Sequence, residues 1–246
     1  KKIIDERLAK AKKSNKVSAL KASVAADNSN IDAETAKKLK DISGAQLKKS
    51  NTVINRNIAL LIDKSGSMES AIELGKRLAS AIATAIDDNH KLHVYAFDSM
   101  PRKIVSNGKD LGSWEKAMSE LSAGGGTACG LAIDALRRID GSVDQLVFIT
   151  DECVAGAPNV SVAYDNVAKH FGFNPSVRII RCNGSFGKGE GVFEPLEKKG
   201  YVDIDRIDFN GDYYSVPNLL LFLNKSSRLD LLLEIMDYKL PVRKSN

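Results

Sequence analysis

The chain has 246 residues, of which 43% are hydrophobic and 27% charged, a composition typical of globular domains. Its length corresponds to one large domain or one and a half, enough to bury a sizeable core. The longest apolar run, Leu219–Leu223, is far too short for a spanning helix, and the charged opening residues Lys1–Asp5 do not read as a secretory signal. The 3 cysteines argue against a disulfide scaffold, so we expect a cytoplasmic protein with no membrane segment.

The net charge of +5 is unevenly distributed along the chain. Residues 1–50 hold 13 Lys/Arg against 6 Asp/Glu, whereas residues 51–246 hold 23 against 25. The basic segment 1–50 has apolar residues at helical spacing but too few for a core of its own. It is therefore interpreted either as a solvated helical face or as a segment that contacts RNA. The candidate RNA contacts are Lys10, Lys12, Lys13 and Lys16.

After a polar linker at 51–56, the pattern of residues 57–246 changes to alternating strands and helices. The expected strands are 58–62, 92–97, 102–105, 146–149, 177–180 and 202–207, the third pairing with the second as a hairpin. The expected helices are one that starts near Ser67, then 114–121, one after Thr127, 160–171, 217–223 and a final one after Ser227. This alternation predicts an α/β fold: a Rossmann-like, mostly parallel open sheet with helices on both faces.

Three polar clusters fall at one predicted edge of this sheet. Asp63, Ser65 and Ser67 follow the first strand, Thr127 follows a glycine run, and Asp151 follows the strand 146–149. In open α/β sheets, ligands bind beyond the carboxyl ends of the strands. Two carboxylates and three hydroxyls are oxygen ligands, which suit Mg²⁺ or Mn²⁺ and are poor for zinc. Mg²⁺ keeps exchangeable waters, so an incoming carboxylate or phosphate could complete its shell.

This arrangement resembles the metal-ion-dependent adhesion site (MIDAS) of von Willebrand factor A domains. The resemblance rests on Asp63-Lys64-Ser65-Gly66-Ser67-Met68, Thr127 and Asp151 and covers about residues 57–223. It implies Asp63, Ser65, Ser67 and Thr127 as ligands, direct or through water, with Asp151 acting mainly through water. Lys64 and Glu152 are possible rim residues. Glu152 departs from the family, in which a small residue is common there, and it could tighten metal binding or repel acidic ligands.

Within that class the chain most resembles the C-terminal domain of Ro ribonucleoproteins, the TROVE family. The segments that carry this resemblance are Val94–Asp98, Ala123–Cys129 and Val147–Glu152. In that family the A domain follows a ring of helical repeats that binds small noncoding or misfolded RNA. The basic segment 1–50 would then be the end of such a ring, and the chain, which begins with Lys, would be part of a longer protein.

Other readings of the same residues stay open. Asp63 could be a phosphatase nucleophile, although that chemistry needs a second acid where Ser65 stands, and Ser67 could simply cap a helix. The cysteines Cys129, Cys153 and Cys182 are read as buried free thiols rather than a metal set. The sequence thus predicts a non-enzymatic Mg²⁺-dependent binding module for an acidic ligand, in a Ro-like RNA-binding protein. The alternatives are a protein-interaction A domain without an RNA role and a metal-dependent phosphatase.

Overall fold

The computed structural model describes residues 53–153, 156–182, 191–213 and 216–225. The basic segment 1–50 with its four candidate lysines, the glycine-rich stretch 184–190 and the predicted final helix after Ser227 lie outside these residues. Among the described residues, no helix combines the length and the apolar character needed to cross a bilayer.

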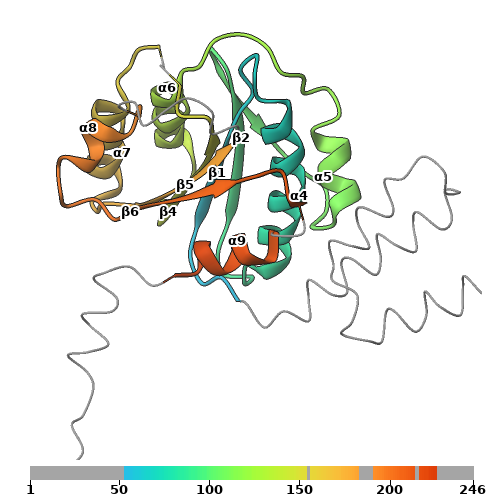
Figure 1. Ribbon diagram of the computed structural model, residues 1–246. Helices are drawn as coiled ribbons and strands as arrows, with labels where there is room; N and C mark the ends of the chain where they lie inside the picture. The colour runs from blue at the N-terminus through green and yellow to red at the C-terminus, as the bar shows by residue number, and fades with distance from the viewer. Residues whose placement is uncertain (1–52, 154–155, 183–190, 214–215, 226–246) are drawn as a thin grey trace, which may run out of the picture.

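A six-stranded sheet forms the centre of the domain, in the order β3-β2-β1-β4-β5-β6 (Figure 1). The strands are β1 Ile58–Asp63, β2 Leu92–Phe97, β3 Pro101–Ile104, β4 Gln145–Thr150, β5 Ser176–Cys182 and β6 Ile204–Phe209. Among these described strands only β3 runs antiparallel, paired with β2 as the sequence predicts. The predicted mostly parallel α/β sheet is thus confirmed.

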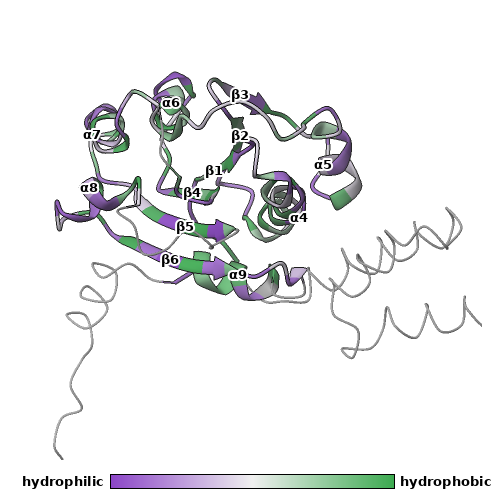
Figure 2. Cartoon of the chain, turned by 45° about the horizontal axis from the view of Figure 1, so that its top comes forward, coloured by the Kyte–Doolittle hydropathy of each residue, from purple (hydrophilic) through white to green (hydrophobic). Residues whose placement is uncertain are grey.

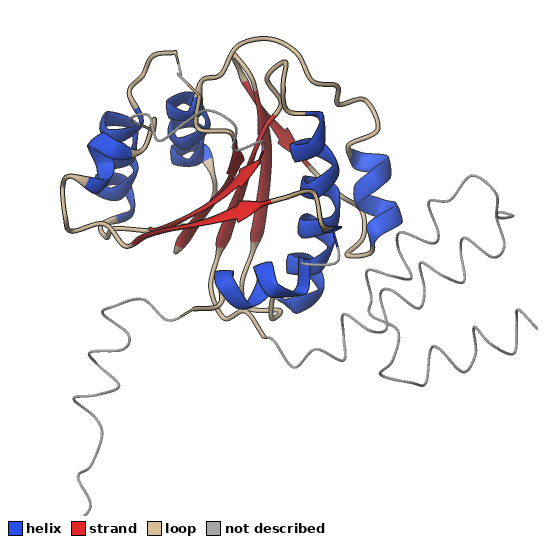
Figure 3. Ribbon diagram, in the orientation of Figure 1, coloured by secondary structure: helices blue, strands red, loops and turns tan. Residues whose placement is uncertain are grey.

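Helices cover both faces of the sheet (Figure 3). They are α4 Glu69–Ala85, α5 Leu111–Ala117, α6 Cys129–Ala135 with a 3₁₀ turn Leu136–Arg138, α7 Val160–Phe171, α8 Glu194–Glu197 and α9 Val216–Leu223. Parallel strands need crossover connections of this kind, and the helices are amphipathic because each turns one face to the sheet. In Figure 2 the hydrophobic colour of α4 accordingly gathers on one side of the helix.

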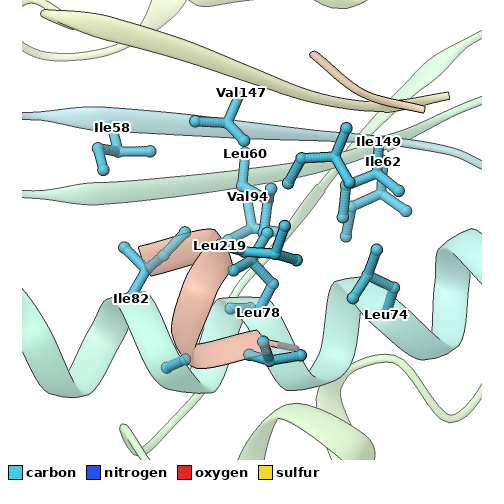
Figure 4. Packing of buried hydrophobic residues seen from close by; sticks show 14 of the residues in the cluster. Ile58, Leu60, Ile62, Leu74, Leu78, Ile82, Val94, Val147, Ile149 and Leu219 are labelled. Atoms are coloured by element: carbon cyan, nitrogen blue, oxygen red, sulfur yellow. The ribbon is translucent and has the colours of Figure 1, made fainter. Parts of the chain in front are cut away.

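Each face of the sheet has its own hydrophobic cluster, because successive strand residues point to opposite faces. One cluster joins Leu60, Ile62 and Val147 of the strands to Leu78 of α4 and Leu219 of α9 (Figure 4). The other joins alternate strand residues, Leu61 and Phe148 among them, to α6 and α7. Both β1 and β4 are buried along their whole length, which explains their continuous apolar sequences.

The start and the far edge of the domain differ from expectation. Ile54, within the predicted polar linker, is 1% exposed and forms a parallel bridge with Ile86, so the folded unit includes residues before 57. Strand β6 begins at Ile204 rather than 202, since its register pairs Ile204 with Val177 of β5. The short helix α8 was not expected from sequence.

The chain crosses over at the middle of the sheet in a way that positions a site. From β1 it proceeds through α4 to β2 on one side, and it later returns to β4 on the other side of β1. The connections from β1 and from β4 therefore diverge to opposite faces. Such a switch point leaves a crevice at the carboxyl ends of the two strands, where ligands of this fold class bind. Asp63 ends β1, and Asp151 follows β4.

Candidate metal site

Asp63 is the most deeply buried polar residue of the candidate site, with 0% of its surface exposed. One carboxylate oxygen accepts a hydrogen bond from Ser65 N at 2.9 Å, and the other accepts one from Thr150 Oγ1 at 2.8 Å. Burial raises the pKa of the Asp63 carboxyl, and the nearby Asp151 carboxylate also raises it, while these hydrogen bonds lower it. The site thus holds two carboxylates close enough to repel each other.

The turn between β1 and α4 presents Ser65 and Ser67 differently. Ser65 is buried, and its carbonyl accepts a hydrogen bond from Met68 N at 2.9 Å. Ser67 is exposed, and its hydroxyl donates to Asp151 Oδ2 at 3.0 Å. The N-cap of α4 is Met68, which forms no side-chain cap, and Ser67 stands one residue before it. Ser67 joins two segments that are 84 residues apart.

The Asp151 segment is held in place by hydrogen bonds close to the strand end. Asp151 Oδ1 accepts a bond from Cys153 N at 3.0 Å, and Thr150 Oγ1 accepts one from Glu152 N at 3.1 Å. Thr150 therefore donates to Asp63 while it accepts from the backbone that follows Asp151. These bonds fix the two carboxylates relative to each other.

Thr127 lies in a loop whose backbone is bonded to the neighbouring loops. Gly124 N donates to Lys64 O at 2.8 Å, Ala128 N donates to Asp98 O at 2.8 Å, and Gly156 N donates to Thr127 O at 2.7 Å. The structure thereby brings this loop to the segments after β1, β2 and β4. The Thr127 hydroxyl has no hydrogen-bond partner within the described part of the chain, which leaves its oxygen available to a ligand.

The charges around the site are arranged unevenly. Lys64, expected at the rim, forms an ion pair with Asp98, and Glu152 forms one with Arg206. Over the described ranges, neither Asp63 nor Asp151 has a Lys, Arg or His partner. A buried carboxylate without a counter-charge is costly, and Asp63 is such a carboxylate.

Sequence reasoning assigned no role to Thr150, Asp98 or Arg206. Thr150 could have been found from strand register, because Ile62 of β1 pairs with Ile149 of β4 and Asp63 and Thr150 are the next residues on each strand. No sequence signal indicates the pairing of Lys64 with Asp98 or of Glu152 with Arg206, since each joins distant segments. The described residues contain no group of three or more His, Cys, Asp or Glu suited to a metal. Any metal here must therefore rely on the hydroxyls.

The three cysteines are free thiols, with Cys129 and Cys182 buried and Cys153 half-buried. Burial raises the pKa of Cys129, and it raises the pKa of Cys182 to about 12. Burial and the Asp151 carboxylate also raise the pKa of Cys153. The thiolate is the nucleophile, so a raised pKa slows its reactions.

We therefore expect Cys129 and Cys182 of the native protein to resist iodoacetamide at pH 7.5. Cys153 should react more slowly than a free cysteine, and all three should react in denaturant. Mass spectrometry of each labelled peptide measures the three rates separately. Rapid native labelling of Cys129 would contradict its burial and reopen a redox role.

Residues 58–153 match the family model of the von Willebrand factor type A domain. This part of the chain is thus similar to a von Willebrand A domain, and the fold is of that type. The strand order and the placement of helices on both faces agree with that fold. No match to this sequence was found among curated proteins.

Several solved structures share the von Willebrand A fold of this chain at low sequence identity. The Ro (RSR) protein of Deinococcus radiodurans has a TM-score of 0.58 and 18% identity, covering 89% of this chain and 47% of that one. A von Willebrand factor type A protein from Catenulispora acidiphila has a TM-score of 0.50 and 17% identity, and the match covers 69% of this chain and 42% of that one. Proximal thread matrix protein 1 from the mussel byssus, with a zinc-occupied MIDAS motif, has a TM-score of 0.50 and 16% identity. The match covers 70% of this chain and 48% of that protein. This chain thus spans under half the length of each of these three proteins.

Proposed function

We propose that the edge of the sheet beyond β1 and β4 binds a divalent cation, Mg²⁺ or Mn²⁺, which in turn binds an acidic group of a partner. The observation that carries the proposal is the pair Asp63 and Asp151, two neighbouring carboxylates that lack a basic partner among the described residues. A cation between them would relieve their repulsion and offset the burial of Asp63. The byssus protein with its zinc-occupied MIDAS motif supports such a use of this fold.

The residues present fit a hard cation. Asp151, Ser67 and Thr127 offer a carboxylate and two hydroxyls at the surface edge of the site, while buried Asp63 and Ser65 lie beneath them. Because both Asp63 oxygens already accept hydrogen bonds, Asp63 acts through ordered water or as a buried counter-charge. The metal would supply an electrophilic centre for a carboxylate or phosphate oxygen. Few protein charges neutralise it, so an acidic ligand is attracted.

The proposed role is that of a binding module and not of an enzyme. A phosphatase nucleophile must reach its substrate, but Asp63 has no exposed surface and both of its oxygens are engaged. This favours the adhesion-type reading over the metal-dependent phosphatase. Its location in the cytoplasm stays a prediction from the sequence.

The experiment that tests this function is thermal unfolding with Mg²⁺ or with EDTA. Mg²⁺ should raise the melting temperature, because a ligand that binds only the native state stabilises it by mass action. Ser67→Ala should weaken the affinity for Mg²⁺ by about tenfold, which corresponds to the loss of one polar contact to a charge. The control is Ser119→Ala, which removes an exposed hydroxyl just after α5 that donates to Lys116 O. A wild-type melting curve that is the same in Mg²⁺ and EDTA would refute the proposal.

A second proposal concerns RNA. We infer that the basic segment 1–50 contacts RNA, supported by its excess of 13 basic over 6 acidic residues and by the shared fold with a Ro protein. Binding to a small structured RNA should weaken steeply between 50 and 200 mM salt, since neutralised phosphates release counterions.

Replacing Lys10, Lys12, Lys13 and Lys16 by glutamine should weaken RNA binding far more than Ser67→Ala does. Filter binding at two salt concentrations measures both effects. If no RNA is bound at low salt, the protein-interaction domain without an RNA role becomes the better reading.

A further inference from the structure

Glu152 places a third carboxylate directly after Asp151, yet its side chain is only 6% exposed. Its backbone has a φ of 59°, in the left-handed region that residues other than glycine rarely adopt. Arg206 of β6 binds it in a bidentate manner, with Nε to Oε1 at 2.7 Å and Nη2 to Oε2 at 3.0 Å. Charge-assisted pairs of this geometry are the strong and directional ones.

The surroundings of this pair hold the carboxylate in one position. Arg206 also forms an ion pair with Glu197 of α8, so one guanidinium joins β6, α8 and the segment after β4. A Cβ at Gly191 would lie 2.5 Å from Glu152 Oε2, so the chain at Gly191 passes closely over the carboxylate. The absence of a side chain at Gly191 makes room for the Glu152–Arg206 pair.

Glu152 is near enough to the candidate metal site for its charge to matter there. Glu152 N donates to the Thr150 hydroxyl at 3.1 Å, and that hydroxyl donates to Asp63 Oδ2 at 2.8 Å, so Glu152 lies next to both carboxylates of the site. Released from Arg206, Glu152 would add an unpaired negative charge beside a cation. An acidic ligand arriving from outside would then meet a competing carboxylate and a less positive site.

We propose that Arg206 is a positioning residue that holds Glu152 away from the cation and so keeps a coordination position open for an acidic partner. This inference rests on the metal-binding function proposed above. While Arg206 binds Glu152, the site is open and accepts an external carboxylate. Without this pair, the chain's own Glu152 carboxylate closes the site.

The test measures Mg²⁺ affinity by thermal shift and acetate affinity by titration of the Mg²⁺-saturated protein. Arg206→Met should tighten the binding of Mg²⁺. It should weaken the binding of acetate by about tenfold or more, because a like charge is then placed beside the ligand. Adding Glu152→Gln to Arg206→Met should restore acetate binding to the wild-type level. A purely structural role of Arg206 would not be rescued by removing a second charge. Arg102→Met, which breaks the exposed pair between Arg102 of β3 and Glu120, is the matched control.

The outcomes separate the inference from the function beneath it. If the wild type shows no response to Mg²⁺, the proposed function has failed, and this inference falls with it. If the wild type binds Mg²⁺ and acetate but Arg206→Met binds both equally well, only the inference is overturned. The same holds if the double variant fails to recover acetate binding. Should Arg206→Met not fold, Arg206→Lys keeps the charge without the fork and should give an intermediate loss of acetate affinity.

Discussion

Replacing Asp63 by asparagine is expected to abolish the stabilisation by Mg²⁺ and at the same time to raise the melting temperature of the metal-free protein. Asn keeps the size of the side chain and an oxygen that can accept the bond from Ser65 N, but it removes a buried negative charge. Without a cation this charge opposes folding at pH 7, in keeping with the raised pKa of the Asp63 carboxyl. With a cation it is the main source of attraction.

The expected size of the metal effect follows from mass action. At a Mg²⁺ concentration a hundredfold above Kd, the wild type gains about 2.7 kcal/mol, or roughly 5–10 °C for a domain of this size. Asp63→Asn should show none of this gain. Asp165→Asn removes an exposed carboxylate of α7 and should leave the metal effect unchanged. An Asp63→Asn protein that responds to Mg²⁺ like the wild type would show that the cation binds elsewhere.

Much of the fold could be predicted because hydrophobic pattern alone determines it. Strand β1 is buried on both faces, so Ile58–Ile62 is a continuous apolar run, and α7 shows its buried stripe at helical spacing. The polar residues that directly follow β1 and β4 also indicated loops at these strand ends. The candidate residues Asp63, Ser67 and Asp151 could be grouped because the carboxyl ends of neighbouring parallel strands share an edge.

The parts that could not be predicted depend on contacts between distant segments. The role of Ser67 was ambiguous because a serine before a helix looks like a cap, and only the tertiary structure directs its hydroxyl to Asp151. Glu152 was left with two opposite roles because its partner, Arg206, is 54 residues away. The limits of β6 follow from its register with β5, which local propensity does not encode.

Gly130→Ala is expected to destabilise the native state by about 3 kcal/mol, because overpacking against backbone cannot be relieved by a change of rotamer. A Cβ at Gly130, in the first turn of α6, would lie 2.0 Å from the carbonyl oxygen of Pro158. The helix or the segment before α7 must therefore move. Gly156, in that same segment, donates its N–H to Thr127 O, so the movement also displaces Thr127 and should reduce the stabilisation by Mg²⁺.

Gly124→Ala is the control, since its Cβ would have nothing within 4 Å. Urea unfolding with and without Mg²⁺ measures both effects. Equal unfolding free energies for Gly130→Ala and Gly124→Ala would contradict the close packing of α6, and with it the position of Thr127 on which the site depends.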